Sequence, residues 1–209
     1  MLEVASVLPE AIYDELRSLI VDQSYGPGTS LTESAVALRF GVARPTAKMA
    51  IERLVTEGLL RRELHQSARV PQLDATDIID LFDNRAVIES AAVAALQAVP
   101  ADAVTAHRAL LASDGNFAND DIAFHRALVA GQPSPRLARM HALLMGEIEL
   151  CIGQVQAAHL LTAAEIGAQH QGILDAITAG DAAEASRLTT EHIAGSRDRL
   201  LSHQRNHHG

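Results

Sequence analysis

Four side chains in the second half of the sequence have spacings that could assemble a metal site. Asp121 and His125 are four residues apart and therefore share one face of a helix. His170 lies ten residues before the dipeptide Gly180-Asp181, and His192 lies eleven residues after it. If that dipeptide is the tight turn of a helical hairpin, the two histidines stand at nearly the same height on neighbouring helices. One carboxylate and three imidazoles from three helices could then converge.

The types of these side chains restrict the metal. Oxygen and nitrogen donors without a thiolate suit Zn²⁺, Ni²⁺, Mn²⁺ or Fe²⁺, whereas histidine is a poor ligand for Ca²⁺. Such a metal could activate a water molecule, so a metal-dependent enzyme is one interpretation. Another interpretation needs no metal. The sequence holds ten histidines among 209 residues, so an aspartate–histidine pair at helical spacing can arise by chance or as an ion pair.

The composition indicates that helices must position these residues. Hydrophobic residues make up 48% of the chain and aromatic residues only 3%, so Ala, Leu, Ile and Val must build the core, which favours packed helices. The single cysteine excludes an intramolecular disulfide framework and fits a reducing cytoplasm. No apolar stretch approaches the roughly 18 residues that a membrane helix needs. We expect a cytoplasmic protein with no membrane partner.

The sequence from Asp74 onward reads as helices separated by short connections. Asp74 or Thr76 can cap the first of them. The expected helices span about 74–96, 102–112, 116–130, 136–158, 162–179 and 181–202. Six helices with short connections predict an all-α antiparallel bundle.

The amino-terminal third has a different pattern. We expect helices at 9–23, with Pro9 in the first turn, at 30–39, where Ser30 and Glu33 have capping-box spacing, and at 44–57. Extended runs at 59–64 and 68–72 follow and predict a β-hairpin. This order is the winged helix-turn-helix arrangement, in which the third helix enters the major groove of DNA. The predicted fold is mostly α, with domains at 1–73 and 74–209.

The charge is distributed in agreement with these domains. The net charge of −9 by itself argues against DNA as a partner, because phosphate binding needs lysine and arginine. Residues 39–73, however, hold seven basic and three acidic side chains, a local net charge of +4. Residues 74–209 hold nine basic and 17 acidic side chains, a net charge of −8. The basic side chains therefore concentrate on the predicted third helix and hairpin, where DNA binding requires them.

The segments Leu31-Thr32-Glu33, Gly41 to Lys48, Arg53-Leu54 and Glu57-Gly58-Leu59-Leu60 resemble the GntR family of bacterial transcription regulators. The family pattern implies that Arg44, Thr46 and Lys48 on the third helix, and Ser67 in the wing, contact double-stranded operator DNA. Arg44 suits a guanine edge and Lys48 a phosphate. The chain departs from the family pattern, which usually has a serine at 43, an arginine at 48 and a glycine at the wing tip, and often an arginine where this chain has Ser34.

A second resemblance covers the helical part. The segments Asp120 to His125, Gln169 to Ile177 and Glu191-His192-Ile193 resemble the FCD domain, an effector-binding domain found with the winged helix in one GntR subfamily. The family pattern implies that Asp121, His125, His170 and His192 are metal ligands. It also implies a small organic acid as the effector. Arg85 and Glu89 match a family Arg-x-x-x-Glu pattern. Arg85 could reach the effector carboxylate, or the two could form a surface ion pair.

Other polar residues match no motif. His107, His159 and His203 are expected in solvent, and Cys151 is expected to be buried. His141, Glu147 and Glu149 on the long helix could line the effector pocket, although such residues more often lie at the surface or behind the ligands.

The combined interpretation is a ligand-responsive repressor that acts as a homodimer on an operator. Two alternatives remain at this point, a regulator that senses the metal itself and a metal-dependent enzyme.

Overall fold

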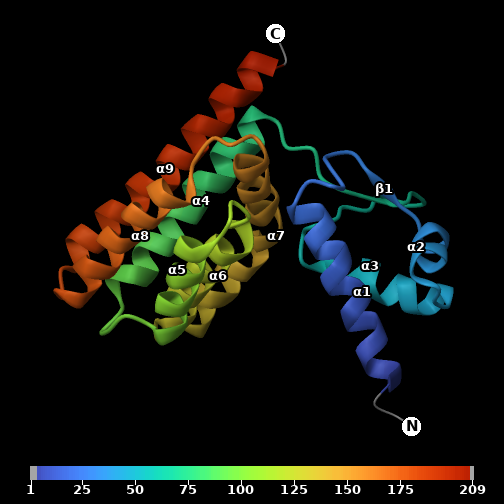
Figure 1. The fold of residues 1–209 in the computed structure, drawn as a ribbon, viewed down its shortest axis with the longest axis horizontal. Helices are drawn as coiled ribbons and strands as arrows, with labels where there is room; N and C mark the ends of the chain where they lie inside the picture. Colours follow the sequence, from blue (N-terminus) through green and yellow to red (C-terminus); the bar gives the residue numbers. More distant parts are fainter. Residues whose placement is uncertain (1–3, 208–209) are drawn as a thin grey trace.

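The computed structural model describes residues 4–207, which form two lobes, so Met1–Glu3 and His208–Gly209 of the predicted domains lie outside the described residues. The smaller lobe contains the amino-terminal elements and the larger lobe the remaining helices (Figure 1). Among the described residues, no helix combines the length and apolar character needed to cross a membrane.

The amino-terminal lobe is the predicted winged helix-turn-helix. Its elements are α1 (Val4–Val21), β1 (Ser30–Leu31), α2 (Glu33–Phe40), α3 (Arg44–Thr56) and β2 (Ala68–Arg69). Buried Leu16 of α1 and buried Ile51 and Leu54 of α3 belong to one apolar core. Gly41 ends α2 with φ of +65°, a conformation that glycine adopts readily, and thereby permits the tight turn into α3.

Two predicted helix starts in this lobe are wrong. Helix α1 begins at Val4, so Pro9 lies inside it rather than in its first turn. Helix α2 is capped by Thr32, whose Oγ1 accepts a hydrogen bond from the Ala35 amide at 3.1 Å. Ser30 cannot be this cap because it already lies in β1, where it pairs with Arg69.

The wing differs from the predicted hairpin. Strand β2 pairs antiparallel with β1, which precedes α2, and the predicted first arm at 59–64 meets β2 only in one bridge between Arg61 and Arg69. Buried Leu59 and Leu60 belong to the core. The Val70 amide bonds to the Thr29 carbonyl at 3.0 Å. The predicted arm at 59–64 therefore pairs with β2 only at Arg61, while β2 forms its strand ladder with β1.

The carboxy-terminal lobe is the predicted bundle of six helices. They are α4 (Ala75–Ala94), α5 (Ala101–Ala112), α6 (Ala118–Gly131), α7 (Pro135–Ala157), α8 (Ala163–Thr178) and α9 (Ala182–His207). Helix α4 runs beside α9, α7 and α6, while α5 packs on α6 and α8. Asp74 caps α4 in a capping box with Asp77. Helix α9 extends beyond its predicted end at 202.

Helix α7 joins the two lobes. It lies at the edge of the bundle next to α1 (Figure 1), and its buried Ile148 and Val155 share a core with Leu16 of α1. Two glycines of α7 permit a close approach. A Cβ atom at Gly146 would lie 2.0 Å from the Glu57 carbonyl oxygen, and one at Gly153 would lie 1.9 Å from that of Val21. The lobes therefore touch backbone to backbone along α7.

We expect Gly146→Ala to destabilise the protein, because the new methyl group collides with a backbone that cannot yield as a side chain can. Overpacking of this kind costs about 1–3 kcal/mol. The measurement is the unfolding midpoint in heat and in urea. Gly195→Ala on α9 is the matched control, because its Cβ would meet only Arg199 Nη1 at 3.7 Å. That control should gain up to about 1 kcal/mol from helix propensity. Equal midpoints for the two variants would contradict this account of the interface.

Candidate functional site

The bundle brings the four predicted ligand residues together. Asp121 and His125 come from α6, His170 from α8 and His192 from α9, and all four are buried. One ligand atom from each lies within 4.8 Å of the others. Helices α8 and α9 are joined by a tight turn at Gly180, so the hairpin inferred from the sequence is present and sets His170 opposite His192.

The facing atoms of this cluster have few hydrogen-bond partners. Asp121 Oδ1 lies 3.2 Å from His170 Nε2 and 3.7 Å from His125 Nε2. His125 Nε2 lies 3.2 Å from His192 Nε2. Asp121 Oδ1 and both ring nitrogens of His170 are buried without a well-formed hydrogen bond. Buried polar atoms of this kind normally have a partner, and a cation among them would provide it.

Residues around the cluster fix the orientation of two imidazoles. His125 Nδ1 donates to Glu89 Oε2, and His192 Nδ1 donates to Gln169 Oε1, both at 2.6 Å. Each Nδ1 therefore carries a proton, and the two Nε2 atoms face one another across 3.2 Å. When neither Nε2 carries a proton, their lone pairs repel unless a metal ion lies between them. Outer acceptors on ligating histidines are a regular feature of metal sites.

The electrostatics favour the forms that bind a cation. Burial, which disfavours the imidazolium, lowers the pKa of His170 to about 4 and holds that of His192 well below its ordinary value. Burial alone would raise the pKa of Asp121, but the contacts with His170 and His125 outweigh it, and that pKa lies below its usual range. At neutral pH the cluster therefore contains a carboxylate and at least two neutral imidazoles.

The donor set fits a divalent transition metal. Two nitrogens bound to one ion at about 2.1 Å lie roughly 3 Å apart, close to the separation of His125 Nε2 and His192 Nε2. With three nitrogens and one oxygen, Zn²⁺, Ni²⁺, Mn²⁺ and Fe²⁺ all suit the cluster. That Asp121, His125, His170 and His192 bind such an ion stays a prediction.

Arg85 lies inside the bundle rather than at the surface. Its side chain is 1% exposed, so the surface ion pair considered from the sequence is wrong. Its Nε donates to Glu89 Oε1 at 2.8 Å, while its Nη2 is buried without a partner. Burial alone would raise the pKa of Glu89, but the Arg85 and His125 charges and the His141 hydrogen bond hold it well below the ordinary value. Arg85 thus keeps one unused donor in the interior.

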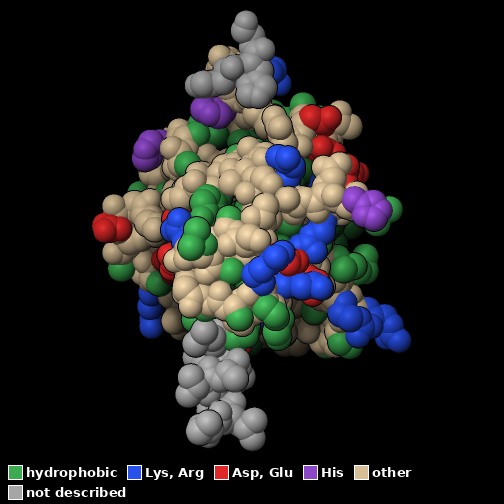
Figure 2. Space-filling model, turned by 90° about the vertical axis from the view of Figure 1, so that its right-hand side faces the viewer, with side chains coloured by type: hydrophobic (Ala, Val, Ile, Leu, Met, Phe, Trp, Pro, Cys, Tyr) green, Lys and Arg blue, Asp and Glu red, His purple; other side chains and the backbone are tan. Residues whose placement is uncertain are grey.

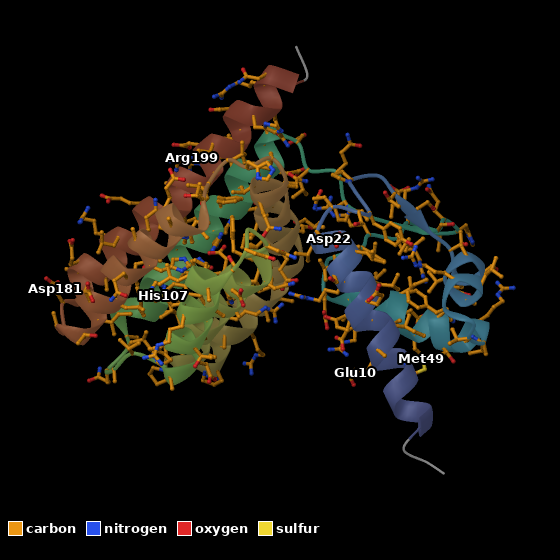
Figure 3. The ribbon with its side chains drawn as sticks, viewed as in Figure 1. Glu10, Asp22, Met49, His107, Asp181 and Arg199 are labelled. Atoms are coloured by element: carbon orange, nitrogen blue, oxygen red, sulfur yellow. The ribbon has the colours of Figure 1, made fainter. Side chains whose placement is uncertain are left out.

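The structure also buries polar residues that the sequence interpretation placed elsewhere. His107 is 5% exposed, so its predicted position in solvent is wrong, and Figure 3 shows it among the bundle helices. Its Nε2 contacts Gln171 Oε1 at 3.1 Å. A usable signal exists, since Ala103, Ala106 and Leu110 place His107 on the inward face of α5.

Two residues of α7 are buried behind the cluster or at the lobe interface. His141 Nε2 contacts Glu89 Oε1 at 3.0 Å, and Glu149 is fully buried. Glu147 pairs with Arg61 of the amino-terminal lobe.

Cys151 is buried as predicted, and burial raises the pKa of its thiol to about 12. His159 is exposed as predicted, whereas His203 is half-buried.

The predicted DNA-contacting residues lie on the amino-terminal lobe. The side chains of Arg44 and Lys48 on α3 are 69% and 52% exposed. Arg44 and Ser67 line one hollow of about 300 Å³ between the start of α3 and the wing, together with Arg62. Thr46 is half-buried and does not line that hollow. Figure 2, which faces this lobe, shows lysine and arginine side chains gathered on its lower part.

The departure from the family at position 43 has a structural consequence. Ala43 occupies the N-cap of α3, and no side chain accepts a hydrogen bond there. Pro45 sits in the first turn, where its fixed φ suits the helix. The Thr46 amide instead donates to the Ala43 carbonyl at 3.0 Å, and Pro45 has no amide hydrogen to donate.

Comparison with known proteins places both lobes in described families. Residues 8–70 match the model "Bacterial regulatory proteins, gntR family", and residues 80–195 match the model "FCD domain". Among curated relatives, the HTH-type transcriptional repressor NanR of Cronobacter sakazakii is 27% identical, covering 89% of this chain and 82% of its own. The HTH-type transcriptional repressor GlaR of Escherichia coli is 27% identical, covering 87% and 90%.

Solved structures agree on the fold. A GntR-type structure from Rhodococcus sp. RHA1 superposes with a TM-score of 0.78 at 24% identity, covering 93% of this chain and 97% of that one. E. coli McbR/YncC superposes with a TM-score of 0.75 at 18% identity, covering 94% and 98%.

The family and its curated members are transcription regulators and not enzymes, so the alternative of a metal-dependent enzyme is wrong. The chain belongs to the GntR family of bacterial transcription regulators and carries an FCD domain in its carboxy-terminal part.

Proposed function

We propose that this regulator is a cytoplasmic, homodimeric repressor whose bundle binds a small carboxylate beside a divalent metal ion. The observation that carries the proposal is the buried set of Asp121, His125, His170 and His192, whose ligand atoms lie within 4.8 Å of one another. A cation bound among these atoms would satisfy them, and a cation with open coordination positions can hold a carboxylate.

The effector class is supported by Arg85. Its Nη2 is buried without a partner and therefore can donate to an anion that enters the bundle. Glu89 already accepts from Arg85, His125 and His141, so this carboxylate is well compensated and leaves the Arg85 Nη2 donor to a ligand. A small organic acid could thus contact the metal through one oxygen and Arg85 through another.

The operator contacts follow from exposure and position. Arg44 stands at the start of α3 with its guanidinium in solvent, where it can read a guanine edge. Lys48, one turn further, is placed for a phosphate, while Thr46 and Ser67 contribute shorter polar contacts.

A homodimer presents two such surfaces to an operator with two half-sites. The curated names NanR and GlaR both describe repressors, which supports the same sign of regulation here.

A metal-sensing regulator is the second candidate. The cluster is buried and its ligand atoms lie within 4.8 Å of one another, so the metal alone could order the three helices that supply them. Operator titrations of the metal-loaded protein with and without a small carboxylate separate the two functions. The carboxylate changes the operator affinity only if the acid is the effector.

We expect Arg44→Ala to weaken binding to a duplex selected by the wild type by roughly 10- to 100-fold, because one bidentate base contact contributes about 1–3 kcal/mol. Fluorescence anisotropy at fixed salt measures the affinity. Arg199→Ala is the control, since Arg199 lies exposed on α9, on the bundle side of the molecule (Figure 3). Equal affinities for Arg44→Ala and wild type would overturn the assignment of α3 as the DNA-reading helix.

We expect His170→Ala to lower the bound metal from one ion per chain to a small fraction, because it removes one of four ligands. Elemental analysis of protein purified without chelators measures the content, and circular dichroism checks the fold. Asp121→Asn keeps the shape of the site and should lower the metal content as well. His159→Ala, an exposed histidine outside the cluster, is the control. Wild-type metal content in both cluster variants would refute the ligand set.

A further inference from the structure

Glu149 of α7 is a carboxylate with no exposed surface, and it lies where the two lobes meet. An ionised carboxylate in such a place needs nearby positive charge, because burial removes its hydration. Both of its oxygens are paired with arginines. Arg126 Nη2 donates to Oε1, whereas Arg17 Nη2 lies 2.8 Å from Oε2 as a charge contact without a well-formed hydrogen bond.

The two arginines belong to different lobes. Arg17 comes from α1 of the winged lobe, and Arg126 comes from α6 of the bundle. Arg17 also donates from Nη1 to Asn119 Oδ1 of α6 at 3.1 Å. Helix α6 thus contacts the Arg17–Glu149 pair twice, through Asn119 and through Arg126.

Helix α6 has two functional faces. Asp121 and His125 point into the metal cluster. Asn119 and Arg126, seven residues apart and therefore on one face, line an interlobe hollow of about 400 Å³ beside Arg17. Because His125 and Arg126 are consecutive, a shift or rotation of α6 that seats the ligands also moves Arg126 and Asn119.

Helix α7 provides the fixed side of this arrangement. Its His141 contacts Glu89, which in turn accepts from His125. Its Gly146 and Gly153 hold it against the backbones of the winged lobe on both sides of Glu149. Close packing of α7 against the winged lobe therefore places Glu149 at the interface, with Arg126 of α6 as its partner from the bundle.

We propose that the Arg17–Glu149–Arg126 bridge transmits the occupancy of the metal cluster to the winged lobe. This inference rests on the proposed function, namely that the cluster binds a metal and that α3 binds an operator. In this arrangement of α6 and α1 both arginines reach Glu149. The bridge therefore stabilises one relative position of the lobes, and a site that repositions α6 changes that preference. Unequal stabilisation of two arrangements is what coupling between two sites requires.

The test compares operator affinity in the zinc-loaded and chelator-treated states of full-length protein. The ratio of the two dissociation constants is expected to be about fivefold or more in the wild type, within the usual range of coupling. Arg126→Met should bring the ratio close to one while zinc still binds at one ion per chain. Arg126→Lys, which keeps the charge, should retain part of the ratio. Arg199→Met is the control and should keep the wild-type ratio.

The outcomes separate this inference from the proposed function. Failure of the wild type to bind zinc, or any duplex, refutes the proposed function itself. If the wild type binds both, a ratio of one in the wild type, or a wild-type ratio in Arg126→Met, overturns the bridge alone. Linkage supplies a second reading, because the operator must change the zinc affinity by the same factor. That reciprocal change should also vanish in Arg126→Met, and its persistence would contradict the bridge.

Discussion

Compensation of charge inside a helical bundle is the constraint on which this structure depends. Glu89 and Arg85 are buried on α4 and Asp121 on α6, and none of them can recover its lost hydration from solvent. Glu89 obtains donors from three helices, namely Arg85 of α4, His125 of α6 and His141 of α7. The positions of these helices are thereby tied to one carboxylate.

Asp121 is compensated less completely than Glu89, and the difference explains the chemistry of the site. Its Oδ1 has only imidazole nitrogens nearby, and two of those imidazoles have their protons committed to outer acceptors. The bundle thus satisfies one buried carboxylate with three donors and leaves an oxygen of the other without a well-formed hydrogen bond, which supports the proposed cation site. In the proposed function the metal therefore completes the interior and also ties α8 and α9 to α6.

The sequence predicted the parts of this arrangement that depend on local order. Helical periodicity predicted the six bundle helices, and the residue count around Gly180 predicted that His170 faces His192. The errors have tertiary causes. Ser30 was expected as a helix cap but is used by a strand whose partner, Arg69, is remote in sequence. His107 was expected in solvent because no motif includes it, although its neighbours on α5 show the inward face.

Burial of Glu149 could not be predicted, because its partners Arg17 and Arg126 come from two other helices, one of them in the other lobe. Gly146 and Gly153 carry no interface signal either, since glycine within a helix is ordinarily only a loss of propensity. Their role follows from the carbonyl groups that α7 approaches, and those belong to segments far away in the chain. Contacts between lobes are thus the part of the fold that local patterns describe least.

The two proposed binding surfaces respond to different features of the solution. Arg44 and Lys48 act from solvent, so their contribution to operator binding falls steeply as salt rises. The metal cluster is buried, so salt screens it little. A connection between the DNA-binding surface and the buried cluster must therefore act through movement of helices rather than through charges that salt screens. Glu149 is fully buried while Arg17 and Arg126 are 22% and 49% exposed, so the proposed bridge has its carboxylate in the interior and its two guanidinium groups within reach of solvent.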